Sequence, residues 1–460
     1  MRIETICANA SPQQGQSVKR IVLSVIVVIY ILLAALYAIL TPKWQAPDEP
    51  AHFNYIRAIA ETGALPVLQR GDYDQQYLEQ IKAAKFPPAM PIDAIRYESY
   101  QPPLYYLAAT PVYLITRGAG LDAMVVALRL FSVALGVIVL FVAFRIVREI
   151  FPDDDWLALA TVGLMATVPQ HLAVSASISN DLAAELVLTL ILWLAVKRAK
   201  NMLSNRRFVL LGGILYGAAL LTKTTTYVPG ALLLLAAEIA RVHITRIRFT
   251  FFVLRNVFHV LVVALLLAAP MFIRNALTYG IADPLGLARH DAIVIGQPTT
   301  ATMIAEYGFN QIAFDFVAVT FKSFWAQFGW MGVLVNDRIY VALALLTGAA
   351  VFGHALYARK ILRRREQLTP AQWGCLILIN LLLVAAFAGY VAYNGKFLQF
   401  QGRYLFPALI AIALFLVVGL RELIAHEYQR LVFALLYAAL LRQDLACLFW
   451  FIVPQLRVAN

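Results

Sequence analysis

Repeated long apolar runs are the feature that most constrains the fold of this 460-residue chain. A run of roughly 18 or more apolar residues is long enough to cross a bilayer as a helix. Hydrophobic residues make up 61% of the chain and charged residues 14%, and the mean hydropathy is +0.73. Soluble domains carry about 25% charged residues. An all-α polytopic membrane protein is therefore predicted, and a water-soluble enzyme is excluded.

Eleven of the apolar runs are predicted to be transmembrane helices. Their approximate ranges are 21–40, 122–144, 156–174, 181–196, 208–222, 226–240, 253–272, 338–357, 372–392, 404–420 and 431–453. The segment 101–117 is also apolar, but it has about 17 residues and begins near Pro102 and Pro103. We expect it to form a helix in the membrane interface, on the outer face.

The positions of the Lys and Arg residues predict the orientation. They fall mainly in short clusters between apolar runs, as the positive-inside rule describes for cytoplasmic loops. With residues 1–20 as a cytoplasmic tail and 21–40 as a retained first span, these clusters share the cytoplasmic side: Arg145/Arg148, Lys197/Arg198/Lys200/Arg206/Arg207, Arg241/Arg246/Arg248/Arg255, Arg359/Lys360/Arg363/Arg364/Arg365 and Arg421/Arg430. The same distribution argues against nucleic acid as a partner, despite the net charge of +12.

The expected organisation is one integral membrane domain, residues 21–460, with long outer loops at about 41–121 and 274–337. Long loops in compact proteins tend to carry function. In the last span, Arg442 and Asp444 are expected to form a buried ion pair, because isolated ionisable groups are unfavourable in a membrane.

Two adjacent acids follow the first span in the segment 47–56, PDEPAHFNYI. Helix capping by Asp48, with Glu49 in the first helical turn, explains one acid there as well as catalysis does. Capping does not explain why His52 and aromatic residues gather beside the acids at a membrane surface. A carboxylate beside apolar lipid can act as a general base on an acceptor hydroxyl or amine. Asp48 and Glu49 are the candidate catalytic residues, and His52 is a candidate substrate contact.

Four further residues of the outer face are candidate substrate contacts. Tyr100 opens the segment YQPPLYY, which is expected to wall a groove for an isoprenoid or a sugar ring, or to form an aromatic belt. Asp181, after the third span, is an N-cap, a second acid of the site, or a metal ligand together with Asp48. Lys223 is either a snorkelling surface lysine or a phosphate contact. Arg274, after the seventh span, is either an interface anchor or a phosphate contact.

Arg403 is the strongest candidate for phosphate binding. It lies in QGRYLFP, residues 401–407, on a face where the positive-inside rule disfavours arginine. Interface anchoring is the alternative. Arginine binds phosphate in a bidentate manner, and Gly402 permits a close backbone approach.

Together these motifs resemble the GT-C glycosyltransferases, whose well-known branches include the protein O-mannosyltransferases and the aminoarabinose transferases of lipid A. The resemblance spans about residues 20–420 and is carried by PDEPAHFNYI, YQPPLYY, KSFWAQFGWM and QGRYLFP, with RNALTYG at 274–280. These strings resemble still more closely a bacterial membrane family of unassigned function that is related to those enzymes. The sizeable soluble C-terminal domain of some branches has no counterpart in this chain.

The resemblance implies a membrane glycosyltransferase of the bacterial inner (plasma) membrane, with its active site on the extracytoplasmic face. The donor would be a polyprenyl-phosphate sugar, and the acceptor a cell-envelope glycan, a lipid or a protein. Asp48 maps onto the base of the family, Asp181 onto its second-loop acid, and Lys223, Arg274 or Arg403 onto its phosphate contacts. Transfer by single displacement would invert the anomeric carbon. Branches differ in their use of a divalent cation, so a metal-dependent and a metal-free reaction both stay open.

A flippase or carrier of a lipid-linked sugar is the rival interpretation. Such a transporter should show a polar path across the bilayer and commonly an internal repeat. The polar groups of this sequence gather at one face instead, which favours an enzyme. A membrane scaffold for envelope synthesis is a third interpretation.

Overall fold

The computed structural model describes residues 12–245, 250–364 and 367–457. Its described part is helical apart from a two-stranded antiparallel hairpin, β1 (Gln327–Phe328) and β2 (Val333–Leu334). The predicted all-α class is confirmed. Of the expected N-terminal tail, residues 1–11 lie outside the described residues, and residues 12–20 already belong to the first helix.

The helices of the first half are α1 (Pro12–Leu40), α2 (Glu49–Thr62), α3 (Gln75–Ala83), α4 (Leu104–Thr116), η2 (Arg117–Ala119), α5 (Leu121–Ile150), α6 (Asp155–Ala166), α7 (Pro169–Ser175), α8 (Asp181–Ala199), α9 (Asn205–Leu220), η3 (Thr224–Thr226) and α10 (Tyr227–Thr245). Those of the second half are α11 (Thr250–Tyr279), α12 (Leu287–Ile293), α13 (Thr300–Tyr307), α14 (Phe309–Trp325), α15 (Asp337–Leu362), α16 (Pro370–Asn394), η4 (Gly402–Ala408), α17 (Leu409–Leu423), η5 (His426–Tyr428), α18 (Gln429–Ala446), the π-helix η6 (Cys447–Ile452) and α19 (Val453–Leu456).

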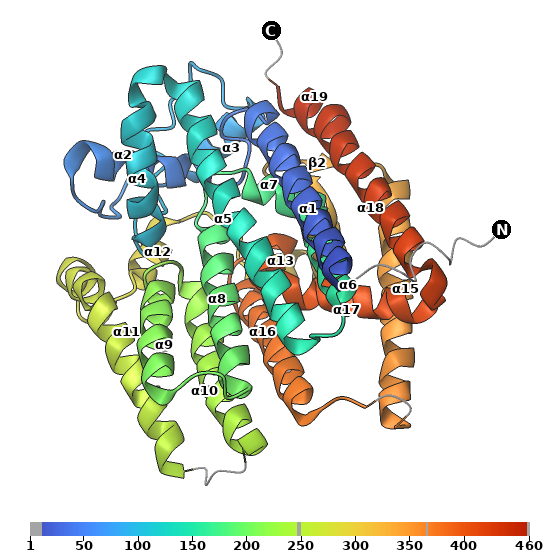
Figure 1. Ribbon diagram of the computed structural model, residues 1–460. Helices are drawn as coiled ribbons and strands as arrows, with labels where there is room; N and C mark the ends of the chain where they lie inside the picture. The colour runs from blue at the N-terminus through green and yellow to red at the C-terminus, as the bar shows by residue number, and fades with distance from the viewer. Residues whose placement is uncertain (1–11, 246–249, 365–366, 458–460) are drawn as a thin grey trace.

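Fewer helices than predicted qualify as membrane spans. Within the described ranges, eight are long and apolar enough to cross a membrane, or nine if the bent pair α6 and α7 counts as one span. The expected number of eleven is therefore too high. The two predicted spans that fall short are α8, which carries ionisable residues at both ends, and α9, which has only 16 residues. Both nevertheless pack within the helical bundle, α8 against α10 and α9 against α11 (Figure 1).

The segment 101–117 does not form a span, as predicted. Its helix α4 has 13 residues, which at 1.5 Å per residue is about 20 Å and too short for a hydrocarbon core of about 30 Å. It packs on α2 and α5, and together with α3 these helices of the first loop cover one end of the molecule (Figure 1). A separate aromatic core holds this cap together, with Tyr55 and Tyr106 stacked at a centroid distance of 3.8 Å.

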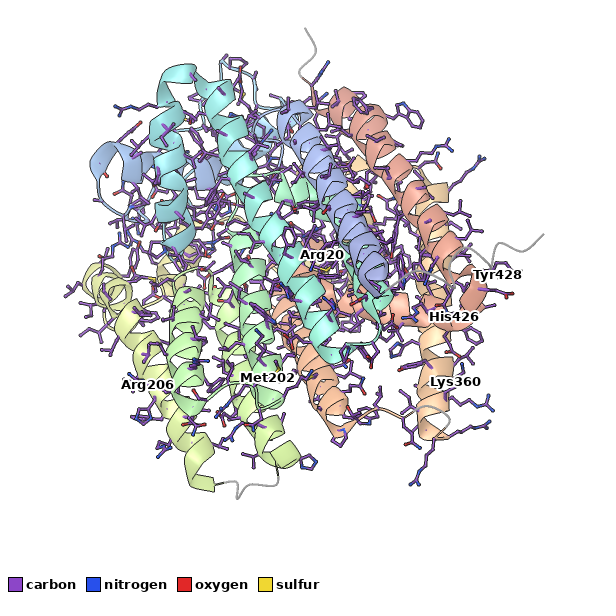
Figure 2. The ribbon with its side chains drawn as sticks, in the orientation of Figure 1. Arg20, Met202, Arg206, Lys360, His426 and Tyr428 are labelled. Carbon is purple, nitrogen blue, oxygen red and sulfur yellow. The ribbon has the colours of Figure 1, made fainter. Side chains whose placement is uncertain are left out.

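The basic helix ends meet at the opposite end of the molecule. Lys19 of α1 and Arg148 of α5 both contact Asp155 at the start of α6. Arg421, at the end of α17, pairs with the neighbouring Asp154 at 2.5 Å. Arg206 and Lys360 lie toward this end as well (Figure 2). Arg246, Arg248 and Arg365 of the predicted clusters lie outside the described residues.

The expected Arg442–Asp444 ion pair is not formed. Arg442 is exposed, whereas Asp444 is fully buried. Residues two positions apart on a helix point to different faces, so the two side chains cannot meet. Neither carboxylate oxygen of Asp444 has a hydrogen-bond partner in the described part of the chain.

Candidate active site

The site is built around Asp48, at the junction between the loop after α1 and the start of α2. Its backbone is left-handed, with a φ of 66°, and its side chain makes no capping hydrogen bond. A non-glycine residue in this conformation costs roughly 1–2 kcal/mol. The carboxylate instead turns inward, where it accepts a 2.7 Å hydrogen bond from the Tyr97 hydroxyl and pairs with Arg403. The capping interpretation of Asp48 therefore does not describe its geometry.

Four charged side chains form an alternating chain at this point. Arg403 contacts Asp48 through Nη2, and its Nη1 lies 3.6 Å from a carboxylate oxygen of Asp181. The other oxygen of Asp181 pairs with Lys223. These residues come from the loop after α1, the start of α8, the turn after α9 and the start of η4. The formal charges of the four cancel, but a bound phosphate would compete with the carboxylates for both cations.

Local structure fixes the positions of Asp181 and Arg403 within this row of four charged side chains. Asp181 lies in the first turn of α8 behind Asn180, which is the N-cap, so Asp181 itself is not the cap. Gly402 approaches the backbone of α14 so closely that an added Cβ would lie 2.3 Å from the Phe324 nitrogen. Its amide donates to the Ser323 hydroxyl at 2.7 Å. The glycine thus lets η4 dock on α14, and this docking positions Arg403 in the site.

Glu49 faces away from Asp48 and has different partners. Its carboxylate is fully buried and makes a bidentate pair with Arg129 of α5, with both contacts at 2.7 Å. It also accepts hydrogen bonds from the backbone amides of Trp44 and Ile178 at 2.9 and 3.2 Å. Every strong acceptor position of Glu49 is therefore occupied by the protein, and Glu49 does not line the cavity described below.

His52 and Tyr100 also lie in the site. The His52 ring contacts the Tyr106 hydroxyl at 2.8 Å through Nδ1. Burial lowers the pKa of His52 to about 4, against an opposing effect of Asp48, so the ring is neutral at pH 7. Tyr100 packs on the ring of His290 at a centroid distance of 4.6 Å, and burial also lowers the pKa of His290.

A cavity of about 930 Å³ connects these groups. Its polar end is lined by Asp48, His52, Tyr97, Glu98, Tyr100, Asp181, Lys223, His290 and Arg403. Its apolar end runs between α8, α10 and α16, past Leu188, Leu232 and Val384. Val384 is 62% exposed on the outside of the helical bundle, so the apolar arm opens sideways. The cavity thus joins a charged centre to an apolar groove.

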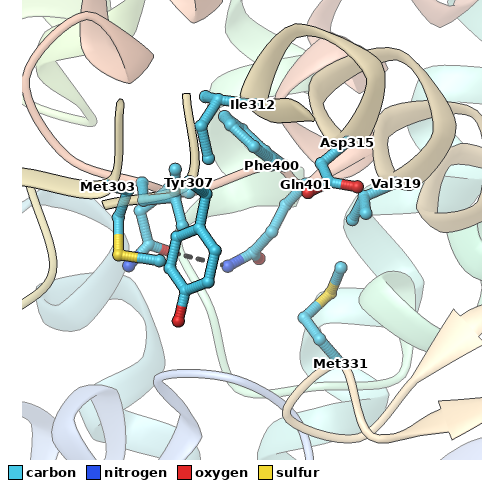
Figure 3. A pocket seen from close by; sticks show the side chains of 10 residues that line it. Met303, Tyr307, Ile312, Asp315, Val319, Met331, Phe400 and Gln401 are labelled. Atoms are coloured by element: carbon cyan, nitrogen blue, oxygen red, sulfur yellow. Dashed lines mark hydrogen bonds between the residues drawn. The ribbon is translucent and has the colours of Figure 1, made fainter. Parts of the chain in front are cut away.

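A second pocket, of about 520 Å³, adjoins the first (Figure 3). Tyr307 of α13 and Asp315 of α14 line it together with Phe400 and Gln401. Four residues line both pockets, namely Met331, Leu398, Gln399 and Gln401. The second pocket and the cavity are therefore neighbours that share part of their lining.

Of the eight residues singled out from the sequence, six line the cavity: Asp48, His52, Tyr100, Asp181, Lys223 and Arg403. Arg274 lies outside it and donates to the carbonyl oxygens of Leu65 and Pro66 at 3.1 and 2.5 Å. Sequence reasoning gave no role to Glu98 or Arg129. Arg129 interrupts an apolar run, which is a usable signal for an intramembrane functional or structural group.

No cluster of three or more His, Cys, Asp or Glu side chains that would hold a metal ion occurs among residues 12–245, 250–364 and 367–457. Asp48 and Asp181 face each other across Arg403, whose guanidinium contacts both acids.

Comparison with known proteins supports the resemblance drawn from the sequence. A family model described as dolichyl-phosphate-mannose-protein mannosyltransferase matches residues 101–273. No curated protein matches in sequence. Among solved structures, ArnT from Cupriavidus metallidurans bound to undecaprenyl phosphate aligns with a TM-score of 0.53 and 15% identity over 90% of this chain. Its apo state aligns with a TM-score of 0.51 and 14% identity over 97%.

The described chain spans about 63% of the length of the undecaprenyl-phosphate-bound ArnT chain and 74% of the apo chain. An Archaeoglobus fulgidus oligosaccharyltransferase matches less well, with a TM-score of 0.47 and 15% identity over 95% of this chain and 53% of its own. The two ArnT alignments, whose TM-scores exceed 0.5, confirm the predicted GT-C-like fold.

Proposed function

We propose that this GT-C-like protein, which carries a mannosyltransferase-family segment at residues 101–273, is a membrane glycosyltransferase. Its donor is a polyprenyl-phosphate-linked sugar, and its acceptor is an envelope glycan, a lipid or a protein outside the cytoplasm. The observation that carries this proposal is the cavity, which joins the charged chain of Asp48, Arg403, Asp181 and Lys223 to an apolar groove. A lipid phosphate sugar has the same division into a charged and an apolar part.

The donor fits the cavity in one direction. Its isoprenoid chain enters between α8, α10 and α16 from the side and covers Leu188, Leu232 and Val384. Its phosphate then reaches Arg403 and Lys223, and the sugar lies against Tyr100 and His52. Burial of apolar surface contributes roughly 25 cal/mol per Å², so a long chain supplies most of the binding energy.

Asp48 is the central catalytic carboxylate in this proposal, because it lies between the cation that would bind the leaving phosphate and the polar wall of the cavity. Arg403 and Lys223 stabilise the phosphate as the sugar departs, an effect that is strong in a site sheltered from water. Single displacement by the acceptor inverts the anomeric carbon. Glu49 acts as a positioning residue, since its pair with Arg129 fixes the backbone beside Asp48. Arg274 braces the first loop.

The orientation belongs to the same proposal. Arg206 and Lys360 lie toward the end of the molecule away from α2–α4 (Figure 2), and by the positive-inside rule this is the cytoplasmic end. The active site then faces the extracytoplasmic side of a bacterial inner membrane. Cysteine labelling from outside at positions 98 and 361 tests this arrangement, and label at 361 but not at 98 would overturn it.

Sugar transfer in membranes tests the activity. Labelled sugars on a panel of polyprenyl phosphates are supplied to membranes that contain the wild-type protein, Asp48→Asn or Asp93→Asn. Asp93 is a matched control, because it is an exposed acid of the same loop that pairs with Arg57 away from the cavity. Label in the product with wild type and Asp93→Asn, but not with Asp48→Asn, is expected. No transfer by folded wild-type protein would favour a flippase and make lipid translocation the next assay.

A further inference from the structure

We propose that the cavity has a separate acceptor site and that this site takes a saccharide, with the Trp330 ring as the surface on which a sugar ring stacks. The inference rests on the proposed function and narrows its acceptor from a glycan, a lipid or a protein to a sugar hydroxyl. The site, called the outer arm, is formed by five residues of the cavity lining, namely Tyr73, Gln75, Glu79, Lys82 and Trp330.

The outer arm begins beside Asp48 and leads to the surface of the cap. The Tyr97 hydroxyl donates to Asp48 at 2.7 Å, and the Tyr73 ring packs edge-on against the Tyr97 ring at a centroid distance of 5.5 Å. Glu79 also lines the cavity and its side chain is 54% exposed, so this arm opens on the surface. The apolar arm runs between α8, α10 and α16 instead. A second substrate can therefore reach Asp48 without entering the groove proposed for the isoprenoid chain.

Trp330 is held in place at the wall of the outer arm. It lies in the turn between β1 and β2, in the string KSFWAQFGWM, to which the proposed function assigns no role. Its indole N–H donates to the carbonyl oxygen of Trp44 at 2.9 Å, and Phe86 stacks on it at a centroid distance of 5.9 Å. The ring is nevertheless only partly buried, and it lines the cavity. A ring that is held by the protein but open to a cavity is a preorganised surface for a ligand.

The position of Lys82 indicates what suits this ring. Its Nζ lies 5.3 Å from the centroid of Trp330, where the negative face of the π-system attracts positive charge. The C–H groups on one face of a sugar ring carry a small positive polarisation, so they suit the same aromatic face. Lys82 pairs with Glu79 at the open mouth of the arm, and its stem is flexible. A sugar can therefore displace the ammonium from the ring while the ion pair persists.

Three polar side chains of α3 supply partners for sugar hydroxyls. Gln75, Glu79 and Lys82 are spaced i, i+4 and i+7, which places them on one face of the helix. Gln75 donates to Glu79 at 2.9 Å and Lys82 donates to it at 2.6 Å, and both contacts are exposed. A hydroxyl both donates and accepts, so it can join an amide, a carboxylate and an ammonium, whereas a lipid chain has no use for them. The ring and these groups together match the apolar face and the polar rim of a sugar.

The transfer step balances with such an acceptor. A hydroxyl oxygen of the saccharide forms a bond to the anomeric carbon of the donor, while the bond from that carbon to the phosphate oxygen breaks. The electron pair of the broken bond leaves with the lipid phosphate, beside Arg403 and Lys223. The hydroxyl proton passes to Asp48 and later to water. The product contains a bond between two sugars.

Saccharide binding is tested without turnover by saturation-transfer NMR on the whole chain in nanodiscs. The probes are a panel of methyl hexopyranosides and methyl pentopyranosides. We expect wild type and Trp330→Phe to saturate the C–H protons of one sugar face, and Trp330→Leu to lose this signal. Trp373→Leu is the matched control, because Trp373 is 46% exposed at the start of α16 and lies outside the cavity lining. No signal with wild type, or an equal signal with Trp330→Leu, would overturn the inference.

Kinetics separate this site from the donor site. Transfer is measured in proteoliposomes with the donor that the transfer assay selects and the methyl glycoside that binds best. Trp330→Leu should raise the KM for the glycoside about tenfold, with little change in kcat or in the KM for the donor. Glu79→Ala should raise the same KM several-fold, and Gln80→Ala, an exposed neighbour on α3, should resemble wild type. A merely structural role for Trp330 would instead lower kcat and the melting temperature, and would contradict the inference.

The linkage in the natural product provides the last test. After transfer to endogenous acceptor in membranes, mass spectrometry should find the labelled sugar bound to another sugar. Partition between chloroform–methanol and water then tells a glycolipid head group from a free glycan, and both carry the expected bond. Label released by β-elimination from protein hydroxyls, or label on a lipid without a further sugar, would overturn the inference while the glycosyltransferase activity stands. Wild-type protein that binds glycosides but uses no donor would remove the proposed function and leave the saccharide site.

Discussion

Two adjacent acids, Asp48 and Glu49, each meet an arginine, but the two pairs differ in almost every other respect. The Glu49–Arg129 pair is sealed, with side-chain exposures of 0% and 2%. The Asp48–Arg403 pair opens on the cavity, and Asp48 is 24% exposed. The remaining N–H groups of Arg129 donate to the carbonyl oxygens of Ala38, Thr41 and Pro42. Arg403 instead contacts a second acid, Asp181.

The difference separates a structural ion pair from a functional one. Both groups of the sealed pair have all the partners they can use, so a ligand has nothing to gain by displacing either. The open pair shares one cation between two acids, and the Nε of Arg403 has no partner in the described residues. An incompletely satisfied cation beside a cavity is ready to bind an anion.

Breaking the sealed pair should have the largest effect. Arg129→Met leaves the buried carboxylate of Glu49 unpaired, and loss of one partner of a buried pair destabilises a protein by about 3–5 kcal/mol. We expect this variant to be unfolded or to melt far below wild type in detergent. The comparison variant is Arg57→Gln, which removes an exposed pair with Asp93 and should change stability by less than about 1 kcal/mol. Equal melting temperatures for Arg129→Met and wild type would contradict the distinction between the pairs.

Removing both charges sharpens this test. In the double variant Glu49→Gln/Arg129→Met, no buried charge is left unpaired, so the stability should recover in part. Recovery will be incomplete, because the carbonyl oxygens of Ala38, Thr41 and Pro42 still lose their donor. A double variant no more stable than Arg129→Met alone would show that these carbonyl contacts, and not the ion pair, matter most.

Breaking the open pair should abolish activity and spare the fold. Asp48→Asn keeps the shape of the side chain, and Arg403 retains Asp181 as a counter-charge. We expect transfer to fall by more than about 100-fold while the melting temperature stays within a few degrees of wild type. A folded Asp48→Asn protein with full activity would refute the proposed centre.

The sequence predicted where this site lies better than it predicted the separate roles of the residues in it. The apolar runs and the polar strings at one face indicated a membrane protein with a centre near Asp48. They did not tell Asp48 from Glu49, because both precede a helix and both suit its first turn. The positive φ of Asp48 turns the two side chains in different directions, and a tertiary fold sets that angle.

The span count illustrates the same limit for the fold. All eleven apolar runs are helical in the structure, but hydropathy alone did not separate full spans from the shorter helix α9 or from the bent pair α6 and α7, whose axes differ by 69°. Packing within the bundle supports such helices. Glu98 was missed for a related reason, since the burial of its Oε2 without a hydrogen-bond partner among the described residues follows from the tertiary fold.

Weakening the open pair without removing its charge should have a smaller effect. Arg403→Lys keeps one positive charge but loses the fork that reaches Asp48 and Asp181 together. We expect the KM for the lipid-phosphate donor to rise about tenfold, with a smaller change in kcat. Lys396→Gln serves as the control, because Lys396 pairs with Asp291 at an exposed position. A larger effect on kcat than on KM would indicate that Arg403 acts chiefly in the transition state.

The smallest effect concerns stability and pH at Glu98. Its pKa in the folded protein, about 7, lies above the ordinary value of 4.5. Between these two values the unfolded chain has released the proton while the folded protein still holds it, so the stability that Glu98 confers is full below pH 4.5 and is lost as the pH rises through 7. Because the side chain is half-buried and faces an open cavity, we expect a loss of about 1–2 kcal/mol. Glu98→Gln should escape this loss, so its melting temperature should exceed that of wild type by a few degrees at pH 8 and match it at pH 4.5. Parallel melting curves for the two proteins across this range would show that Glu98 titrates like an exposed acid.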